Sequence, residues 1–424
     1  MNKLLYVCLD GLGDDPIPEF GGRTPLEAAR TPILDDLARK GSLGLVHTVG
    51  EDIAPESDIA VFAILGYDPR EEHPGRGVLE ALGAGIGSDF RDGDLAYRIN
   101  FATQENGEIV DRRVGRDLPT DDAQALAREV EGNVPIPGFG LWLRATVEHR
   151  GVVVFFHPDG EPLSANVTNT DPAYAKEGSL GVALERFENR VAECRPLDDS
   201  EEARRAAELT NEFVQGAARV LEASEVNARR RANGRLPANL ILTRDGGDHV
   251  PHLQPIKDRF GPEWGCFVEM PVERGIALVL GMDPVDAPTG MPRREQYAGW
   301  AELAAEALAG YDALYVHIKG PDIPAHDGRA RDKLEVIEDI DQSFFAELLP
   351  RIPTGRTVLA VTADHSTSCV RKAHTADPVP LLVAGPGVGS DAAGRFGESA
   401  ARGGSLGLLR GLEIVPQLVN LLRG

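Results

Sequence analysis

The stretch Thr357-Val-Leu-Ala-Val-Thr-Ala-Asp364-His365 is a β-rich apolar run that stops at a carboxylate and an imidazole. Short apolar runs that end at polar residues predict buried parallel strands. Three more segments have this form: Lys3–Asp10, Asn239–Arg244 and Ala313–Lys319. Helical patterns lie near these runs, at 34–40, 201–231, 300–308 and 333–349. Strands that alternate with helices predict an α/β fold, with a parallel sheet covered by helices on both faces.

The region from Tyr97 to Asn189 has a different pattern, in which closely spaced strand-like runs are separated by polar turns and one helical stretch at 121–131. This pattern predicts a small α+β unit inserted into a larger one. We therefore expect a core formed by residues 1–96 and 190–424, with an inserted cap at 97–189.

The composition is that of a globular protein, with 42% hydrophobic residues in 424. Asp and Glu number 67 against 44 Lys and Arg, so the formal net charge is −23. A surface this acidic repels phosphate backbones and anionic lipid, which argues against nucleic acid and membrane partners. A small-molecule substrate is the expected partner, with a homo-oligomer left open.

Four widely spaced cysteines form no C-x-x-C pair, which is typical of reduced thiols in a cytoplasmic protein. The first apolar run, Leu4–Leu9, is shorter than the roughly 7–15 apolar residues of a signal peptide. The sequence therefore predicts a cytoplasmic location.

Chemically capable residues follow each predicted strand. They are Asp10, Arg244, Lys319 with Asp322 close behind, and Asp364-His365. Ligands of open α/β sheets bind at the carboxyl ends of the strands. Each residue alone is more simply explained as a solvated loop residue, but charged groups at four strand ends together indicate a site.

Metal binding is indicated by Asp322-Ile-Pro-Ala-His326, because a carboxylate and an imidazole four residues apart on a loop can reach one cation. His374 adds a third imidazole in a loop. With Asp10, Asp364 and His365 these residues form an Asp/His set without cysteine, which suits Zn²⁺ or Mn²⁺. The number of ligands is enough for two metal ions that share one nucleophile.

Ser57 is the candidate nucleophile, because it lies in a turn just before an apolar helix. The alternative is that Ser57 only caps that helix, which is a common role for serine. Ser57 does not lie in a G-x-S-x-G hydrolase elbow, and the glycine clusters match neither a Walker loop nor a dinucleotide fingerprint. Metal activation is therefore the better route to a reactive serine.

The predicted cap carries an arginine-rich run, Asp111-Arg112-Arg113-Val-Gly-Arg116, with Arg98 and Asn100 nearby. Guanidinium groups bind phosphate and carboxylate in a bidentate manner, so the run is a candidate anion clamp. A solvated, salt-bridged face is the equally open alternative.

Together these motifs resemble the archaeal-type, 2,3-bisphosphoglycerate-independent phosphoglycerate mutases of the alkaline phosphatase superfamily. The resemblance runs nearly end to end and rests on LDGLGD (9–14), GGRTPLEAARTPILDDLA (21–38), APESDIAVFAILGYDP (54–69), GRGVLEALGAGI (75–86), NFAT…DRRVGR, VHIKGPDIPAHDG (316–328) and VTADHSTSCVRKAHTADPVPLLV (361–383). It implies an alkaline-phosphatase-like core with an inserted cap.

The resemblance also implies roles for individual residues. One divalent cation would be bound by Asp10, Ser57, Asp364 and His365, and a second by Asp322, His326 and His374. The ions would be Mn²⁺ or Zn²⁺, with Mg²⁺ and Co²⁺ as further candidates. Arg244 and Lys319 would project from the core as catalytic groups, and the cap would clamp the substrate with Arg98, Asn100, Asp111, Arg112, Arg113 and Arg116.

The implied reaction is the interconversion of 3- and 2-phosphoglycerate through phosphoserine at Ser57. The residues beside Ser57 and Arg244 differ from the usual family pattern: Glu56, Ile59 and Asp245-Gly246 stand where the family commonly has glycine, threonine and Gly-Ala. A metal-dependent phosphomonoesterase, or a mutase or phosphotransferase acting on a phosphonate or a small hydroxy acid, is therefore the alternative. A non-catalytic binding protein is disfavoured by the complete set of metal and nucleophile positions.

Overall fold

The computed structural model describes residues 2–86, 90–177, 180–184 and 186–423. The chain divides into two compact units, which are described separately. Unit 1 comprises residues 1–72 and 253–424, and unit 2 comprises residues 73–252. Within the described residues, no helix is both long and apolar enough to cross a bilayer.

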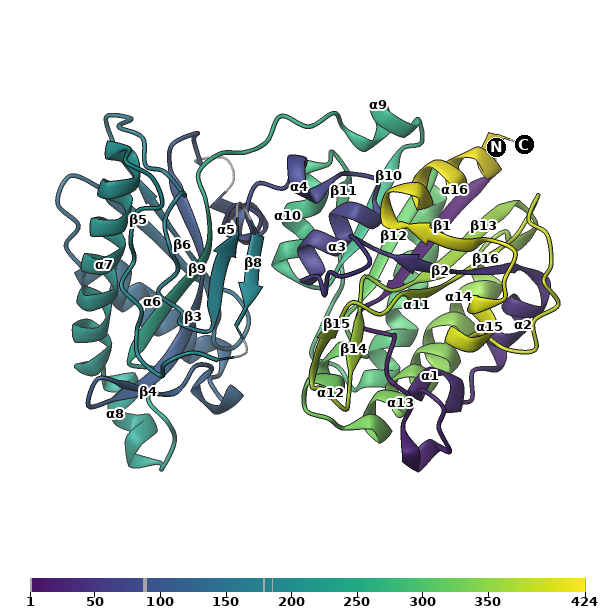
Figure 1. Cartoon of the computed structure of the whole chain (residues 1–424), viewed down its shortest axis with the longest axis horizontal. Coiled ribbons are helices and arrows are strands. Elements are labelled where there is room, and N and C mark those ends of the chain that lie inside the picture. Colours follow the sequence, from purple (N-terminus) through teal and green to yellow (C-terminus); the bar gives the residue numbers. More distant parts are fainter. Residues whose placement is uncertain (1, 87–89, 178–179, 185, 424) are drawn as a thin grey trace. The chain divides into compact units, whose positions relative to one another are not determined.

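Unit 1 is built on an eight-stranded sheet (Figure 1). Its strands, in spatial order, are β11 (Asp283–Asp286), β10 (Trp264–Val268), β12 (Ala313–Ile318), β1 (Lys3–Leu9), β13 (Thr357–Thr362), β16 (Val379–Ala384), β2 (Ser42–His47) and β17 (Gly407–Arg410). β16 runs antiparallel to both of its neighbours, and the other pairs are parallel. The central strands are buried and mainly apolar because both faces of the sheet are covered.

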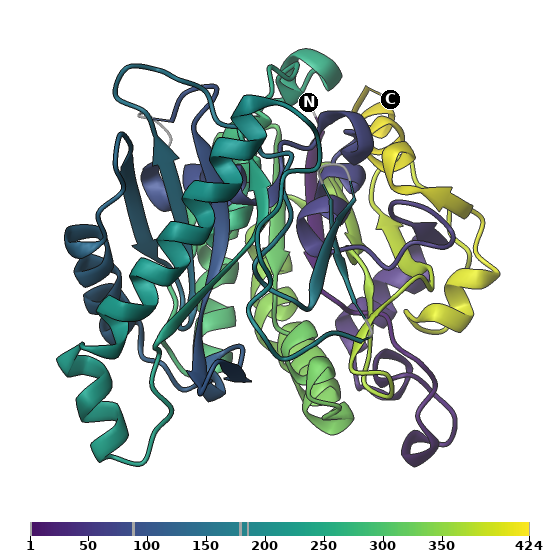
Figure 2. The same cartoon turned by 60° about the vertical axis from the view of Figure 1, so that its left-hand side comes forward.

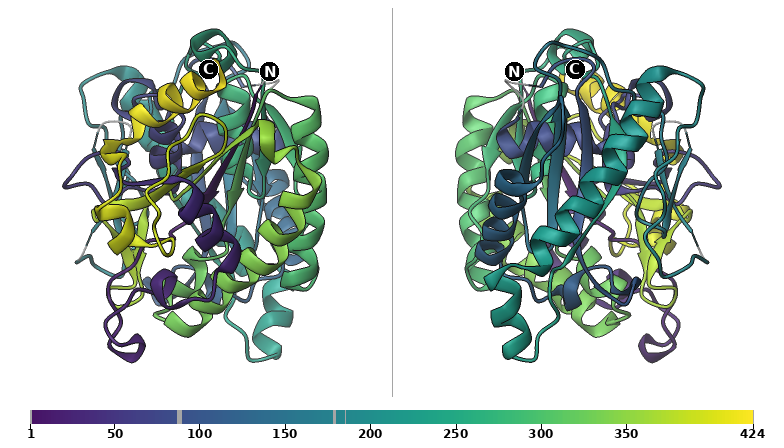
Figure 3. Two further views of the ribbon diagram at one scale, coloured as in Figure 1. Left: turned by 90° about the vertical axis from the view of Figure 1, so that its right-hand side faces the viewer. Right: turned by 90° about the vertical axis from the view of Figure 1, so that its left-hand side faces the viewer.

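Helices cover both faces of this sheet. Figure 3 shows α16 (Ile414–Arg423) on one side of the strands and α11 (Arg293–Gly310) with α13 (Ala330–Asp339) on the other. The remaining helices of unit 1 are α1 (Pro25–Ala28), α2 (Pro32–Lys40), α3 (Ser57–Ile64), α4 (Pro69–Glu72), α9 (Ile256–Phe260), α10 (Pro271–Val279), α12 (Asp322–His326), α14 (Ala346–Leu348) and α15 (Glu398–Arg402). A separate hairpin joins β14 (Ser366–Ser368) to β15 (Ala373–Thr375). The predicted α/β fold with helices on both faces of a largely parallel sheet is confirmed.

Unit 2 contains an antiparallel sheet formed by β4 (Glu108–Asp111), β3 (Leu95–Glu105), β6 (Arg150–Phe156), β5 (Gly140–Ala145) and β9 (Leu240–Gly247). Helices α6 (Thr120–Asn133) and α7 (Glu201–Glu222) pack on one face, where α7 lies across the sheet (Figure 2). Other elements of this unit are α5 (Arg76–Ala81), α8 (Glu225–Ala232), β7 (Tyr174–Glu177) and β8 (Leu180–Ala183).

The central strand β3 has two different faces. Tyr97, Ile99 and Phe101 belong to the apolar core that includes residues of α6 and α7. Because side chains alternate along a strand, Arg98 and Asn100 point to the opposite face, the one that α5 contacts. β3 therefore supports the apolar core of unit 2 and also presents buried polar groups.

The structure corrects one strand of the sequence analysis. The run 239–244 is not a parallel strand of the core, because β9 pairs antiparallel with β3 in unit 2. Every residue of β9 is buried, so its apolar run lacks the alternation that would reveal an antiparallel strand with one solvated face.

The two units divide at 72/73 and 252/253, whereas the expected insert covered 97–189. Unit 2 is longer because α5 contacts β3 and β9, and because α7 packs on the same sheet. Chain segments on both sides of the expected insert therefore share its core.

Candidate active site

Three parallel strands of unit 1 deliver functional groups to one edge of the sheet. β1 lies between β12 and β13, so Asp10, Lys319 and Asp364 all follow strands that end side by side. The Lys319 ammonium donates to Asp10 Oδ2 at 2.5 Å and lies 3.4 Å from Asp322 Oδ2. The structure thus brings together the polar residues that follow three of the four predicted strands, and Arg244, after the fourth, lies in unit 2.

Asp10 and Asp364 form a buried carboxylate pair with His365. One oxygen of each carboxylate and one ring nitrogen of His365 could coordinate the same ion, because these three ligand atoms lie within 4.8 Å of one another. The backbone N–H groups of Gly11 and His365 donate to Asp364 Oδ1, both at 3.0 Å. Asp10 Oδ1 and Asp364 Oδ2 are buried and accept no hydrogen bond from any residue that the structure describes. Unsatisfied buried carboxylate oxygens are costly unless a cation faces them.

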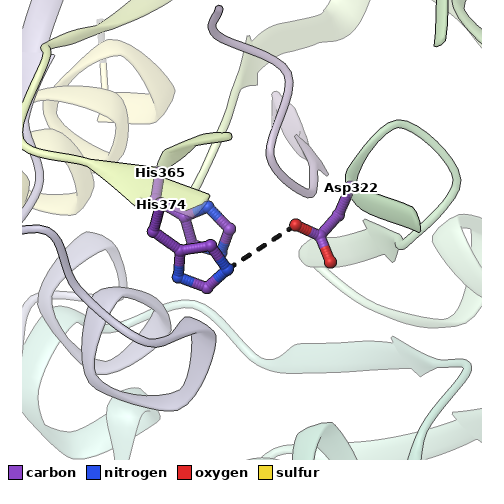
Figure 4. A group of neighbouring side chains, drawn as sticks. All are labelled: Asp322, His365 and His374. Carbon is purple, nitrogen blue, oxygen red and sulfur yellow. Dashed lines mark ion pairs between the residues drawn. The ribbon is translucent and has the colours of Figure 1, made fainter. Parts of the chain in front are cut away.

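A second cluster consists of Asp322, His326 and His374. The Nε2 atoms of His326 and His374 lie 3.1 Å apart, and they are 3.3 and 3.6 Å from Asp322 Oδ1. Figure 4 shows that the ring of His374 lies against that of His365 beside Asp322, and the two ring centroids are 3.7 Å apart. Asp322, His365 and His374 also satisfy the distances for a common ion.

All three histidines turn Nε2 toward these clusters. Nδ1 of His374 lies 2.8 Å from the Pro55 carbonyl oxygen, and Nδ1 of His326 lies 3.4 Å from that of Lys372. Nδ1 of His365 faces the Thr367 hydroxyl instead, at 3.0 Å. An oxygen partner at Nδ1 leaves Nε2 as the metal-binding nitrogen.

The electrostatics of the clusters reflect crowded charge under burial. Burial and the neighbouring Asp10 carboxylate raise the pKa of Asp364 to about 7. Burial, assisted by His374, lowers the pKa of His365 to about 3. Burial also acts to lower the pKa of His374, but Asp322 and Glu56 outweigh it and raise that pKa to about 9. A cation held here by His374 would replace the proton on its imidazole, since a metal ligand must be deprotonated.

Ser57 is buried at the start of α3, and its Oγ lies 3.2 Å from His365 Nε2. The N-cap position is Glu56 and Ser57 is the first residue of the helix, so Ser57 is not the cap. The N-terminus of a helix favours an approaching anion. The position thus suits a nucleophile that attacks a phosphoryl group.

Unit 2 holds an arginine cluster in which two members are buried and three are half-buried: Arg98 and Arg244, and Arg76, Arg113 and Arg150. Arg98 lies directly opposite Arg244 across β3 and β9, and it lies 3.8 Å from the Glu80 carboxylate. Burial, together with Arg244 and Arg76, lowers the pKa of Arg98 to about 9. Arg244 was expected to project from the core, and the structure places it in unit 2. Asn100 follows Arg98 on the same face of β3, with its Oδ1 buried.

The arginine-rich run lies in a strained loop after β4. Val114, Gly115 and Arg116 all have positive φ, at 53°, 63° and 55°, a conformation that costs a non-glycine residue about 1–3 kcal/mol. A pocket of about 440 Å³ is lined by this loop, including Asp111, Arg112, Arg113 and Arg116. Strain of this kind concentrates at ligand-binding sites.

Arg112 forms a bidentate ion pair within unit 2. Its Nε and Nη2 donate to the two oxygens of Asp171 at 2.8 and 2.6 Å. Asp171 is fully buried, and Arg244 stacks on Tyr174 close by, with 3.7 Å between guanidinium carbon and ring centroid. Arg112 therefore fastens the loop to Asp171 through both oxygens of that carboxylate.

Comparisons with known proteins identify the family. A family model described as 2,3-bisphosphoglycerate-independent phosphoglycerate mutase matches residues 38–227. A protein of that name from Aeropyrum pernix is 43% identical, and the match covers 100% of both chains. The chain belongs to the 2,3-bisphosphoglycerate-independent phosphoglycerate mutases. Another relative of that name, from Pyrobaculum neutrophilum, is 37% identical over 100% of this chain and 98% of its own.

Solved structures agree with this membership of the mutase family. A cofactor-independent phosphoglycerate mutase from Thermoplasma acidophilum is 33% identical, with a TM-score of 0.64 and full coverage of both chains. A protein structure from Pyrococcus horikoshii is 32% identical, with a TM-score of 0.79 over 100% of this chain and 97% of that one. The resemblance stated from the sequence motifs is confirmed.

The side chains of this mutase fit divalent metal. The donor set is carboxylate and imidazole without thiolate, which suits Zn²⁺ and Mn²⁺. Independent support for a metal site comes from Asp10 and Asp364. Each has a buried carboxylate oxygen that no donor among the described residues satisfies. The four cysteines are buried free thiols and lie outside both clusters.

Sequence reasoning missed several residues that surround Asp10. His317 Nε2 lies 3.0 Å from Asp10 Oδ2, and Glu273 lies 4.0 Å from the same imidazole nitrogen. Glu269 accepts the backbone N–H of Lys319 at 3.0 Å. The available signal was a histidine inside a mainly apolar strand, two residues before Lys319. Glu269 and Glu273 gave no comparable signal, because they follow β10 and not one of the predicted strands.

Proposed function

We propose that this chain interconverts 3-phosphoglycerate and 2-phosphoglycerate through a phosphoserine formed at Ser57. The observation that carries the proposal is the position of the Ser57 hydroxyl. It lies 3.2 Å from His365 Nε2, beside two Asp/His clusters and at the first residue of α3. Membership of the mutase family supplies the substrate pair.

Two divalent cations, Mn²⁺ or Zn²⁺, are proposed as the cofactors. Asp10, Ser57, Asp364 and His365 would hold one, and Asp322, His326 and His374 the other. When bound, the cations would lower the pKa of the Ser57 hydroxyl and neutralise negative charge on the phosphoryl oxygens. His365 fits both groups, since one of its ring nitrogens also lies within 4.8 Å of ligand atoms of Asp322 and His374.

Side chains of the protein would supply the nucleophile and further stabilise the phosphoryl group. Ser57 Oγ attacks phosphorus in line with the leaving oxygen of the substrate, which gives phosphoserine and glycerate. The Lys319 ammonium is poised to stabilise phosphoryl oxygens, because Asp10 and Asp322 hold it in place and, against the effect of burial, raise its pKa. After glycerate reorients, its other hydroxyl takes the phosphoryl group back from Ser57.

We propose that the arginine cluster of unit 2, together with Arg116, binds the substrate carboxylate. An acidic protein with net charge −23 needs a local excess of cations to attract a trianionic substrate. Retention of glycerate and exclusion of water separate a mutase from a phosphatase. A cytoplasmic location is proposed with this function, in keeping with the four free thiols.

A coupled assay tests the proposal. The protein is treated with chelator, supplied with Mn²⁺ or Zn²⁺, and given 3-phosphoglycerate, while enolase reports 2-phosphoglycerate and a second assay reports free phosphate. We expect metal-dependent formation of 2-phosphoglycerate with little phosphate release. Phosphate release as the main reaction would favour a phosphomonoesterase, and the absence of both products would contradict the proposal.

A further inference from the structure

Thr367 lies between the two Asp/His clusters, in the β14–β15 hairpin. Its hydroxyl donates to Asp322 Oδ1 at 2.9 Å, and the hydroxyl oxygen, Thr367 Oγ1, lies 3.0 Å from His365 Nδ1. The residue is fully buried and pairs with His374 across the hairpin. One hydroxyl group thus contacts a residue of each proposed metal site.

The backbone of Thr367 is fixed on both sides. Its N–H donates to the Gly13 carbonyl oxygen at 2.9 Å, and its carbonyl oxygen accepts from the buried Lys333 ammonium at 2.8 Å. Gly11 passes so close that a Cβ there would lie 2.5 Å from Thr367 Oγ1. The hydroxyl therefore has little freedom to move away from its two partners.

Counting protons decides the direction of both hydrogen bonds. A hydroxyl has one proton to donate, and an ionised carboxylate can only accept. Since Thr367 donates to Asp322, it can only accept from His365, and Nδ1 of His365 must carry the hydrogen. A neutral imidazole has a single N–H, so Nε2 of His365 keeps its lone pair.

We propose that Thr367 is a positioning residue that sets the tautomer of His365 and joins it to Asp322. The inference rests on the proposed metal-dependent function, because its consequence is a lone pair of His365 aimed at Ser57, Asp10 and Asp364. The Nδ1 partners of His326 and His374 are backbone carbonyl oxygens, which accept but cannot donate. Thr367 differs because its hydroxyl can accept from an imidazole and donate to a carboxylate at once.

The first measurement is the tautomer of His365 in metal-free protein. ¹⁵N-histidine-labelled protein is examined by NMR, and His365→Gln identifies the signals. We expect a protonated Nδ1 and an unprotonated Nε2 in the parent and in Thr367→Ser. In Thr367→Val, which keeps the shape and loses the hydroxyl, we expect the hydrogen to shift to Nε2, where Asp364 Oδ2 and Asp10 Oδ1 lie 3.3 and 3.5 Å away.

The second measurement is the affinity for metal alone, by calorimetric titration with Zn²⁺ or Mn²⁺. We expect Thr367→Val to bind about 10–100-fold more weakly and Thr367→Ser to stay close to the parent. Thr362→Val is the matched control, because Thr362 is equally buried but its hydroxyl donates to the Pro380 carbonyl oxygen. The control should lose some stability while the signals of His365 stay unchanged.

A parent protein with hydrogen on Nε2 of His365 would overturn the inference, as would a valine variant with the parent's tautomer and affinity. If Thr367→Val fails to fold, the tautomer of His365 in the parent and in Thr367→Ser still tests the inference. Because the NMR measurement uses neither metal nor substrate, a protein lacking mutase activity would contradict the proposed function and leave the assignment of Thr367 intact.

Discussion

Arg98 and Arg244 lie directly opposite each other on antiparallel strands, and both side chains are buried. Like charges in this arrangement destabilise a sheet. An anion that binds between such groups removes the repulsion and stabilises the folded state by linkage, by about 2.7 kcal/mol at a hundred times its Kd. We therefore expect 3-phosphoglycerate to raise the unfolding temperature of the metal-free parent.

Arg98→Met tests this expectation because it keeps much of the side-chain volume and removes the charge. The variant should be at least as stable as the parent without ligand, and it should lose most of the ligand-induced rise. Arg204→Met removes an exposed arginine of the same unit and should keep the rise. If 3-phosphoglycerate does not change the unfolding temperature of the parent, the arginine cluster has only a structural role.

Ser57→Ala should abolish turnover while most of the metal affinity remains. The change removes the proposed nucleophile but only one of several ligands, and alanine is a good residue for the first turn of α3. Rapid quenching with labelled 3-phosphoglycerate, followed by peptide mapping, should place phosphate on Ser57 in the parent. Label on a histidine, or turnover in the variant near the parent rate, would contradict the mechanism.

Asp364→Asn should stabilise the metal-free protein and weaken its binding of metal. The amide oxygen can still accept from the N–H groups of Gly11 and His365, while an NH₂ group replaces the buried Oδ2 and removes one of two neighbouring negative charges. The gain should be about 1–3 kcal/mol of unfolding free energy.

The Asp364→Asn measurement is unfolding with chelator and then with Mn²⁺. The parent should gain stability from Mn²⁺ and the variant should gain little. A variant less stable than the parent in chelator would show that the carboxylate pair is satisfied without a cation.

Glu398 predicts a pH dependence of stability in a different part of unit 1. Burial raises the pKa of its carboxyl to about 7, and its Oε1 accepts no hydrogen bond from the described residues. Between the unfolded value near 4.5 and about 7, the folded protein holds a proton that the unfolded chain has released. Stability should therefore fall as the pH rises through this window.

Glu398→Gln should remove that loss, because the amide does not ionise and can still accept from the Thr24 hydroxyl. Relative to the parent, the variant should gain about 1–3 kcal/mol between roughly pH 5 and pH 8, measured by denaturant unfolding. The exposed Glu335→Gln should follow the parent at both pH values. Equal pH dependence in parent and Glu398→Gln would refute the assignment.

The sequence predicted those parts of the site that follow buried strands. β1, β12 and β13 are continuous apolar runs in a sheet covered on both faces, so their ends locate Asp10, Lys319 and Asp364 directly. β9 has the same kind of run, and nothing in the run shows that its partner β3 is antiparallel. Local pattern therefore identified the strand but could not assign it to a unit.

Contacts between distant segments explain the other misses. Arg112 belongs to a run that resembles an anion clamp, but its bidentate partner Asp171 lies 59 residues further along the chain. The link from Thr367 to Asp322 depends on how a hairpin packs against α12. Such pairings are set by tertiary structure, and no spacing rule reports them.

The insertion of unit 2 into unit 1 has a consequence for biosynthesis. The two neighbours of β1 in the sheet begin at Ala313 and Thr357, so the first strand leaves the ribosome about 300 residues before either neighbour exists. At about 5–20 residues per second this delay lasts roughly 15–60 seconds. The strands of unit 2 find all their partners within residues 73–252, so unit 2 can fold during that interval. During synthesis this chain therefore carries a folded unit 2 while β1 is still unpaired, and an unpaired apolar strand is the kind of segment that chaperones bind.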